Sequence, residues 1–122
     1  MSKTLTPTLT IASTDTSSDA LSFSVTDALT VGEPMRGISR ISVSHSSKTD
    51  LLPKASQPTQ TYIYLKNTDS SNHIELYTGD EELFGSLFPG EFAFFPVHGG
   101  EGFKLQADTA ACVVEHGYWT KA

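Results

Sequence analysis

Apolar and polar residues alternate with a period of two along most of this chain of 122 residues. The alternation is clear in four segments: LSFSVT (21–26), ISRISVSH (38–45), TYIYLKN (61–67) and HIELYTG (73–79). Because successive side chains of a strand point to opposite faces of a sheet, this pattern predicts half-buried antiparallel strands. Turn-forming residues recur about every ten positions, which is the spacing of a sandwich or a small barrel. We therefore expect an all-β fold, an antiparallel two-sheet β-sandwich.

Three segments depart from the alternation. Residues 1–20 are rich in Ser and Thr, so we expect an extended N-terminal arm there and a single sandwich domain over residues 21–122. Residues 46–60 contain two prolines and predict a long surface loop. A short helix is expected around Glu81–Ser86, where apolar side chains have helical spacing.

Two segments carry apolar side chains on both faces of the predicted strand. In EFAFFPV (91–97) phenylalanines occupy both faces, and ACVV (111–114) shows the same pattern. The outer face of a two-layer domain meets water, so an apolar outer face indicates a contact with something else. We expect these strands to be buried against a second subunit.

The charge balance excludes several kinds of partner. The chain has 8 Lys and Arg against 14 Asp and Glu, a formal net charge of −6, and no basic cluster. Binding of nucleic acid is therefore not expected, since it needs basic side chains gathered on one face. No apolar run approaches the ~20 residues that span a bilayer, so no membrane partner is expected either. The single cysteine and a start without an apolar signal core predict synthesis in a reducing cytoplasm.

One phrase raises the alternative of a metal site. LFPGEFAFFP (87–96) is similar to the Pro-Gly turn and strand of cupins, which are small jelly-roll barrels. Catalytic cupins hold a metal ion among histidine and glutamate side chains. His73, Glu75 and His98 could form a set of two histidines and one carboxylate, provided that they converge on one cavity. The histidines are scattered, however, so polar residues at strand edges are the favoured interpretation. We predict no metal and no cofactor.

Other chemistry finds little support in the sequence. The acidic GDEEL (79–83) lacks the ligand spacing of a calcium loop and is better explained as a solvated turn. Cys112 stands among apolar residues of a predicted buried strand, where a thiol resists ionisation. No serine stands in a Gly-x-Ser-x-Gly elbow, and no glycine-rich phosphate loop is present. We predict no catalytic residue and no enzymatic activity.

The aromatic residues are the candidates for an interaction surface. Tyrosines on the outer face of paired strands could stack on sugar, but they more often stabilise cross-strand packing or line a subunit contact. We favour a contact and retain a glycan-binding module as an alternative. The predicted interface residues are Tyr62, Tyr64, Phe92, Phe94, Phe95 and Trp119.

The segments TYIYLKNTDSSNHIELYTGDEELFGSLFPGEFAFFPV and FKLQADTAACVVEHGYW resemble small virion-associated proteins of tailed bacteriophages, particularly marine and cyanobacterial ones. The resemblance covers the chain after residue 20 and is strongest from Thr61 to Trp119. It implies a jelly-roll-like fold and a structural place in the virion, as a capsid decoration (cement) protein or a neck or tail protein. It transfers no functional residues.

Together these features lead to one expectation. The protein is expected to form a homo-oligomer, a trimer, that binds the major capsid protein or other virion proteins. Its location would be the virion, after synthesis in the host cytoplasm.

Overall fold

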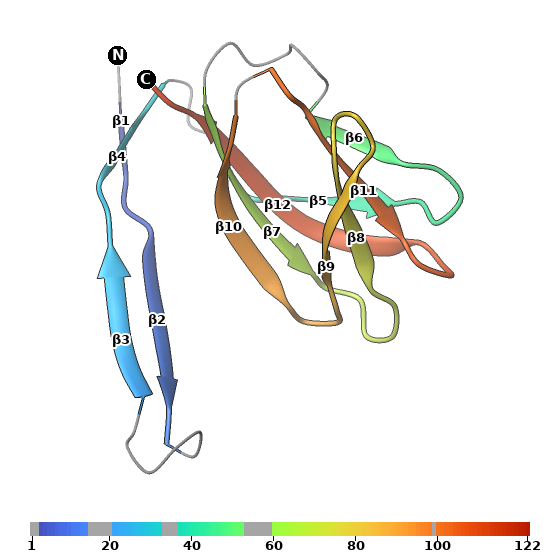
Figure 1. Cartoon of the computed structure of the whole chain (residues 1–122), viewed down its shortest axis with the longest axis horizontal. Coiled ribbons are helices and arrows are strands. Elements are labelled where there is room, and N and C mark those ends of the chain that lie inside the picture. The colour runs from blue at the N-terminus through green and yellow to red at the C-terminus, as the bar shows by residue number, and fades with distance from the viewer. Residues whose placement is uncertain (1–2, 15–20, 33–36, 53–59, 99) are drawn as a thin grey trace.

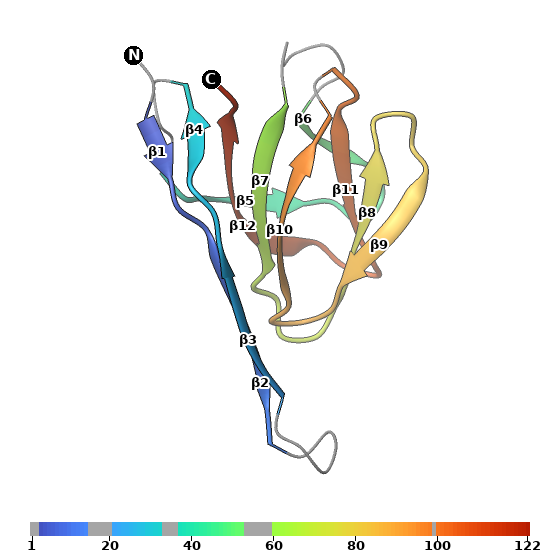
Figure 2. The same ribbon diagram turned by 60° about the vertical axis from the view of Figure 1, so that its left-hand side comes forward.

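The computed structural model describes residues 3–14, 21–32, 37–52, 60–98 and 100–122, and every regular element within these ranges is a β-strand. Eight of the strands form two antiparallel sheets of four strands each. The two sheets lie against each other as layers (Figures 1 and 2). The predicted all-β fold with two antiparallel sheets is therefore confirmed.

The first sheet has the strand order β10-β7-β12-β5. Its strands are β5 (Ser39–Val43), β7 (Thr61–Asn67), β10 (Phe92–Val97) and β12 (Cys112–Thr120). The second sheet has the order β6-β11-β8-β9. Its strands are β6 (Thr49–Leu52), β8 (Ile74–Thr78), β9 (Leu83–Leu87) and β11 (Phe103–Ala107). All the neighbouring strands in both sheets are antiparallel.

The core lies between these two sheets. Ile63, Leu65 and Val114 of the first sheet are fully buried, and Phe103 and Leu105 of the second sheet are buried with them in one cluster. Burial of apolar side chains of this size contributes roughly 1.5–3 kcal/mol each. The alternation noted in the sequence thus supplies one apolar face from each layer.

Residues near the N-terminus form a separate pair of two-stranded ribbons. Strand β1 (Lys3–Leu5) pairs with β4 (Leu29–Val31), and β2 (Thr8–Ser13) pairs with β3 (Leu21–Thr26). The β2–β3 hairpin projects away from the sandwich (Figures 1 and 2). The predicted boundary between residues 20 and 21 falls between the two strands of this hairpin. The expected half-burial of residues 21–26 is wrong, because every residue of β3 is exposed.

Two local predictions are also wrong. The segment expected to form a helix, Glu81–Ser86, is a tight turn followed by most of β9. The amide of Glu81 donates to the carbonyl of Thr78 at 2.9 Å, and the amide of Thr78 donates to the carbonyl of Glu82 at 2.9 Å, so the chain reverses into a hairpin. In the expected long loop, residues 49–52 form β6, whereas residues 53–59 lie outside the described residues.

Candidate functional site

The outer face of the first sheet carries a row of aromatic side chains. Phe94 lies opposite Tyr64, and Tyr62 lies between Pro96 on one side and Trp119 on the other. Residues directly opposite each other in a sheet share a face, so these side chains lie together. Phe92 and Phe94 are 62 % and 37 % exposed. The part of this face that β10 forms is therefore apolar, as the two-sided pattern of residues 91–97 predicts, while its burial against a second subunit stays a prediction.

The β2–β3 hairpin has one apolar face and one hydroxyl face. On the hydroxyl face, Thr8 and Thr26 lie 3.1 Å apart between their Oγ1 atoms, and Thr10 donates to Ser24 at 3.3 Å. The apolar face carries Leu9, Ile11, Leu21, Phe23 and Val25, each between 40 and 53 % exposed. An isolated two-stranded hairpin is at best marginally stable in water. Within the described residues, the apolar face of this hairpin therefore lacks the cover that would normally stabilise such a ribbon.

A groove of about 730 Å³ lies between the base of the hairpin and the outer face of the first sheet. Residues at the base of the hairpin and at the start of β4 form one wall: Pro7, Thr8, Leu9, Val25, Asp27 and Leu29. Strands β7 and β10 supply the facing surface: Tyr62, Tyr64, Phe92, Phe94 and Pro96. The remaining lining residues are Gln60 and Lys121. We call this site the aromatic groove.

A small polar network borders the aromatic groove. The hydroxyl of Tyr64 donates to Oε1 of Glu115 at 2.8 Å, and Nη2 of Arg40 lies 3.4 Å from Oε2 of the same carboxylate. Burial raises the pKa of Tyr64, and the Glu115 carboxylate raises it further. The hydrogen bond from Tyr64 lowers the pKa of Glu115. The network fixes the Tyr64 ring at the groove, with its hydroxyl already engaged.

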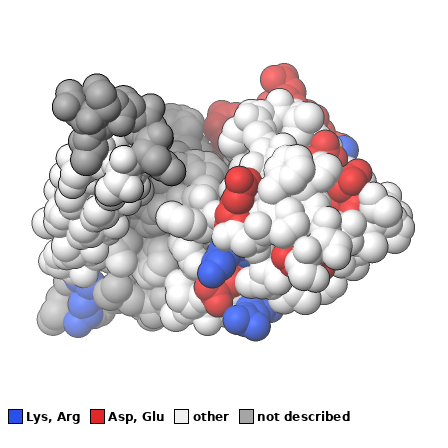
Figure 3. All heavy atoms as spheres, turned by 90° about the horizontal axis from the view of Figure 1, so that it is seen from below, with Lys and Arg blue, Asp and Glu red and all other residues white. Residues whose placement is uncertain are grey.

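The outer face of the second sheet is different in character. Nζ of Lys104 lies 3.2 Å from Glu81 and 3.8 Å from Asp50, and Nζ of Lys48 lies 3.5 Å from Glu81. The two lysines lower the pKa of Glu81. Glu81 belongs to the acidic segment GDEEL (79–83), which was considered above for calcium. Most charged side chains seen from below lie over the sandwich, whereas β2 and β3 carry none (Figure 3). Among the described residues, the exposed aromatic side chains of β10 thus contrast with the charged side chains that gather over the second sheet.

Four of the six predicted interface residues meet at the aromatic groove: Tyr62, Tyr64, Phe92 and Phe94. Phe95 lies on the opposite face of β10 and packs inside the sandwich. Its ring centroid is 5.7 Å from that of Phe103 and 6.2 Å from that of Phe84. Trp119 shares the outer face but is half-buried and does not line the groove. The structure thus assigns Phe95 to the core rather than to an outer contact.

Sequence reasoning missed the hairpin wall of the groove. Leu9, Val25 and Leu29 line it, yet residues 1–20 were expected to be an arm and Val25 a sandwich residue. A signal was present, because Leu9 and Ile11 alternate with polar residues just as Leu21 and Phe23 do. Two alternating segments joined by a short polar stretch are typical of a hairpin.

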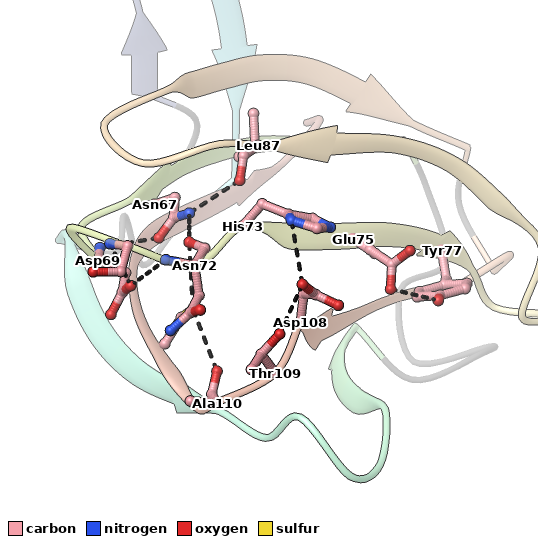
Figure 4. Close-up of polar contacts among 12 residues, drawn as sticks. Asn67, Asp69, Asn72, His73, Glu75, Tyr77, Leu87, Asp108, Thr109 and Ala110 are labelled. Atoms are coloured by element: carbon pink, nitrogen blue, oxygen red, sulfur yellow. Dashed lines mark hydrogen bonds and ion pairs between the residues drawn. The ribbon is translucent and has the colours of Figure 1, made fainter.

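The residues considered for a metal site do not converge. His73 stacks on Phe88, and its Nδ1 lies 3.7 Å from Asp108, while Glu75 turns toward the hydroxyl of Tyr77 at 3.3 Å (Figure 4). His98 comes directly after the end of β10 that pairs with Thr61, at the start of β7. The turn that leads to His73 comes after the other end of β7, so the two histidines lie at opposite ends of this strand. Over the part of the chain that the structure describes, no three His, Cys, Asp or Glu side chains gather closely enough to hold a metal ion.

Cys112 is buried, with 1 % of its surface exposed. Burial raises the pKa of its thiol, and the carboxylates of Asp69 and Asp108 raise it further. Its Sγ lies 3.7 Å from the carbonyl oxygens of Asn72 and Ala110. A thiol held neutral and enclosed in this way behaves as a small apolar side chain rather than a nucleophile.

No family model matches the chain, and neither the curated proteins nor the solved structures include a similar one. Within the described ranges, no helix has the length and apolar character needed to cross a membrane. The function must therefore be inferred from the surface of the protein and from the resemblance noted in its sequence.

Proposed function

We propose that the protein is a structural component of a tailed-phage virion, a capsid decoration (cement) protein that binds and stabilises the assembled head. The observation that carries this proposal is the aromatic groove, where exposed apolar side chains of Phe92 and Phe94 face the base of a hairpin whose two strands carry no charge. Exposed apolar patches rimmed by polar residues mark protein contacts. The phage resemblance of residues 61–119 supplies the context.

The strand order supports a jelly-roll interpretation. A jelly roll has eight strands in two sheets, arranged as two Greek keys. Here the orders β10-β7-β12-β5 and β6-β11-β8-β9 place the eight sandwich strands so that the chain changes sheet at every step except β8 to β9. This is the connectivity expected if the chain is wound as a jelly roll.

The proposed action is binding rather than catalysis. Two of the groups considered for chemistry are engaged elsewhere, because Cys112 is enclosed and Glu75 accepts a hydrogen bond from Tyr77. We propose a homo-oligomer, a trimer, seated on the major capsid protein or another virion protein. Several copies joined in this way convert weak single contacts into strong avidity on a repetitive shell.

Purified particles test this function directly. Mass spectrometry of gradient-purified virions and negative-stain labelling with an antibody against the protein should place it on the head, in many copies. Labelling of the neck or tail would support the alternative structural role instead. Absence from particles that otherwise carry all their proteins would overturn the virion proposal.

A binding assay locates the surface. Phe92→Ser should weaken rebinding of the purified protein to particles that lack it, because Phe92 is 62 % exposed on the groove and losing a contact there, to the shell or between copies, reduces avidity. Leu83→Ser is the matched control, since Leu83 is 56 % exposed on the second sheet. Equal loss of binding by both variants would argue against the groove as the contact.

A glycan-binding module is the second candidate, and one observation favours it. Tyr62 and Tyr64 line a groove beside the Arg40 and Glu115 side chains, and sugar sites combine aromatic faces with charged hydrogen-bonding groups. Saturable binding on a glycan array that is lost in Tyr64→Ala would support this function.

A further inference from the structure

We propose that the apolar face of the β2–β3 hairpin of one copy docks on the aromatic groove of a second copy of the chain. The docking face is the outer part of the ribbon and consists of Ile11, Leu21 and Phe23. This inference rests on the proposed function, because it assigns the contact through which the proposed homo-oligomer forms.

The hairpin cannot satisfy its apolar face on its own sandwich. Leu9 and Val25, near the base of the hairpin, already form a wall of the groove. Ile11, Leu21 and Phe23 lie further along the ribbon, do not line the groove, and are 40, 43 and 46 % exposed. Since these three side chains lie beyond the groove, the described part of the sandwich leaves them open to contact with another molecule.

The receiving surface accepts a face rather than an added strand. β10 is an edge strand of its sheet, and Pro96 near its end has no amide hydrogen to donate to a new neighbour. The side chains of Phe92 and Phe94 instead project from its outer face. An amphipathic ribbon that packs its apolar face on these rings covers both surfaces at once.

Charge locates the place where two copies of the chain can meet. Each chain carries a formal net charge of −6, so two copies repel each other over most of their surfaces. The strands TLTIAS, LSFSVT and FAFFPV carry no charged residue. A contact between the hairpin and β10 therefore brings together the segments where this repulsion is least.

The outer part of the ribbon offers a small contact area. Three side chains that are 40–46 % exposed offer roughly 250 Å² of surface, given ~150–250 Å² for a large side chain. A stable interface buries about 800 Å² per partner, so one such contact alone falls short. In a closed oligomer every copy is held by two of these contacts, one through the hairpin that it gives and one through the hairpin that it receives. Since the two surfaces differ, the contact is head-to-tail, which is the kind of contact that forms a ring when the rotation between copies closes.

The oligomeric state of the full chain tests the proposal. Sedimentation analysis of the wild type should give a closed oligomer, with three times the mass of one chain for the proposed trimer. Phe23→Ser should shift this species to a monomer. Ala12→Ser is the matched control, because it places the same side chain on the hydroxyl face of the ribbon and should leave the mass unchanged. A wild type that remains monomeric at every concentration overturns the proposal.

Cross-linking identifies the two surfaces. When Phe23→Cys and Phe94→Cys proteins are mixed under an added oxidant, a disulfide should join one to the other, while the native Cys112 stays enclosed. A disulfide between two Phe23→Cys chains, without the mixed product, would show that hairpins pair with each other and would overturn the assignment to the groove.

The outcomes separate this inference from the virion role. A monomer that binds particles through Phe23 would retain the proposed function and make a virion protein the occupant of the hairpin face. An oligomer that Phe23→Ser dissociates, but that is absent from particles, would retain the inference and remove the virion role.

Discussion

The ring of Phe94 stacks on the ring of Tyr62, with the two centroids 6.5 Å apart and the ring planes inclined by 12°. The stack joins the edge strand β10 to the neighbouring strand β7 on the outer face of the first sheet. The two partners differ in burial, since Tyr62 is 5 % exposed and Phe94 is 37 % exposed. The side chain of Tyr62 is therefore buried in the folded protein, whereas the ring of Phe94 is partly exposed to solvent.

This difference predicts unequal costs of truncation. Tyr62→Ala should lower the free energy of unfolding by roughly 3 kcal/mol, as large-to-small changes of buried aromatics do. Phe94→Ala should lower it by about 1 kcal/mol, because part of the ring already meets water. Urea unfolding of both variants in the Phe23→Ser background, where we expect a monomer, measures the two values. Equal costs there would contradict the exposed position of Phe94.

The buried amide of Asn67 predicts a second, larger effect on stability. Its Nδ2 donates to the carbonyls of Asn72 at 2.9 Å and Leu87 at 3.0 Å, and its Oδ1 accepts from the amide of Asp69 at 3.0 Å (Figure 4). Asn67→Ala leaves these backbone groups without their partner, so the free energy of unfolding should fall by about 3 kcal/mol. Denaturant unfolding monitors the loss.

Ser70→Ala provides the control for the same turn, because Ser70 is exposed. Its effect should stay within about 0.5 kcal/mol. If Asn67→Ala costs no more than this control, the side chain does not link the turn to β9 as described.

The strands of the sandwich were predictable because their alternation is a local property of the sequence. The burial of a given face is not local. LSFSVT alternates as clearly as TYIYLKN, yet β3 is exposed and β7 is buried, since only β7 has a second sheet against its apolar face. The helix expected at Glu81–Ser86 failed for a related reason: the spacing of its apolar residues suits one helical turn, but pairing with β8 decides the outcome.

The groove was only partly predictable. The two apolar faces of β10 follow from its sequence, but which of Phe94 and Phe95 faces the core depends on the register with β7, and a shift of one residue reverses it. The wall formed by Leu9 and Val25 depends on where the hairpin is attached, which no local pattern records.

His116 predicts a pH dependence of stability. Both of its ring nitrogens are buried without a hydrogen-bond partner in the described structure, and burial lowers its pKa. The folded chain therefore resists protonation of this ring, whereas the unfolded chain takes up the proton below its ordinary pKa of about 6.5. Stability should consequently decrease as the pH falls from 7 toward 5.

Urea unfolding at several pH values measures this slope, and His116→Leu should flatten it. His45→Leu is the control, because His45 is exposed. The carboxyl groups with lowered pKa values, Asp69, Glu81 and Glu115, contribute in a different window, since the unfolded chain protonates them only below about pH 4.5. An unchanged slope between pH 7 and 5 in His116→Leu would assign the pH dependence to other groups.

Gly117 lies beneath the only tryptophan of the chain. A Cβ at this position would lie 2.9 Å from Cδ1 of Ile38 and 3.0 Å from Cη2 of Trp119. Gly117→Ala should therefore displace the indole, shift its fluorescence emission and lower the free energy of unfolding by about 1–2 kcal/mol. Gly37→Ala is the control, because a Cβ there meets nothing within 4 Å. Since Trp119 lies opposite Tyr62, the displacement should also reach the groove and weaken self-association; a shifted emission with an intact oligomer would separate Trp119 from the contact surface.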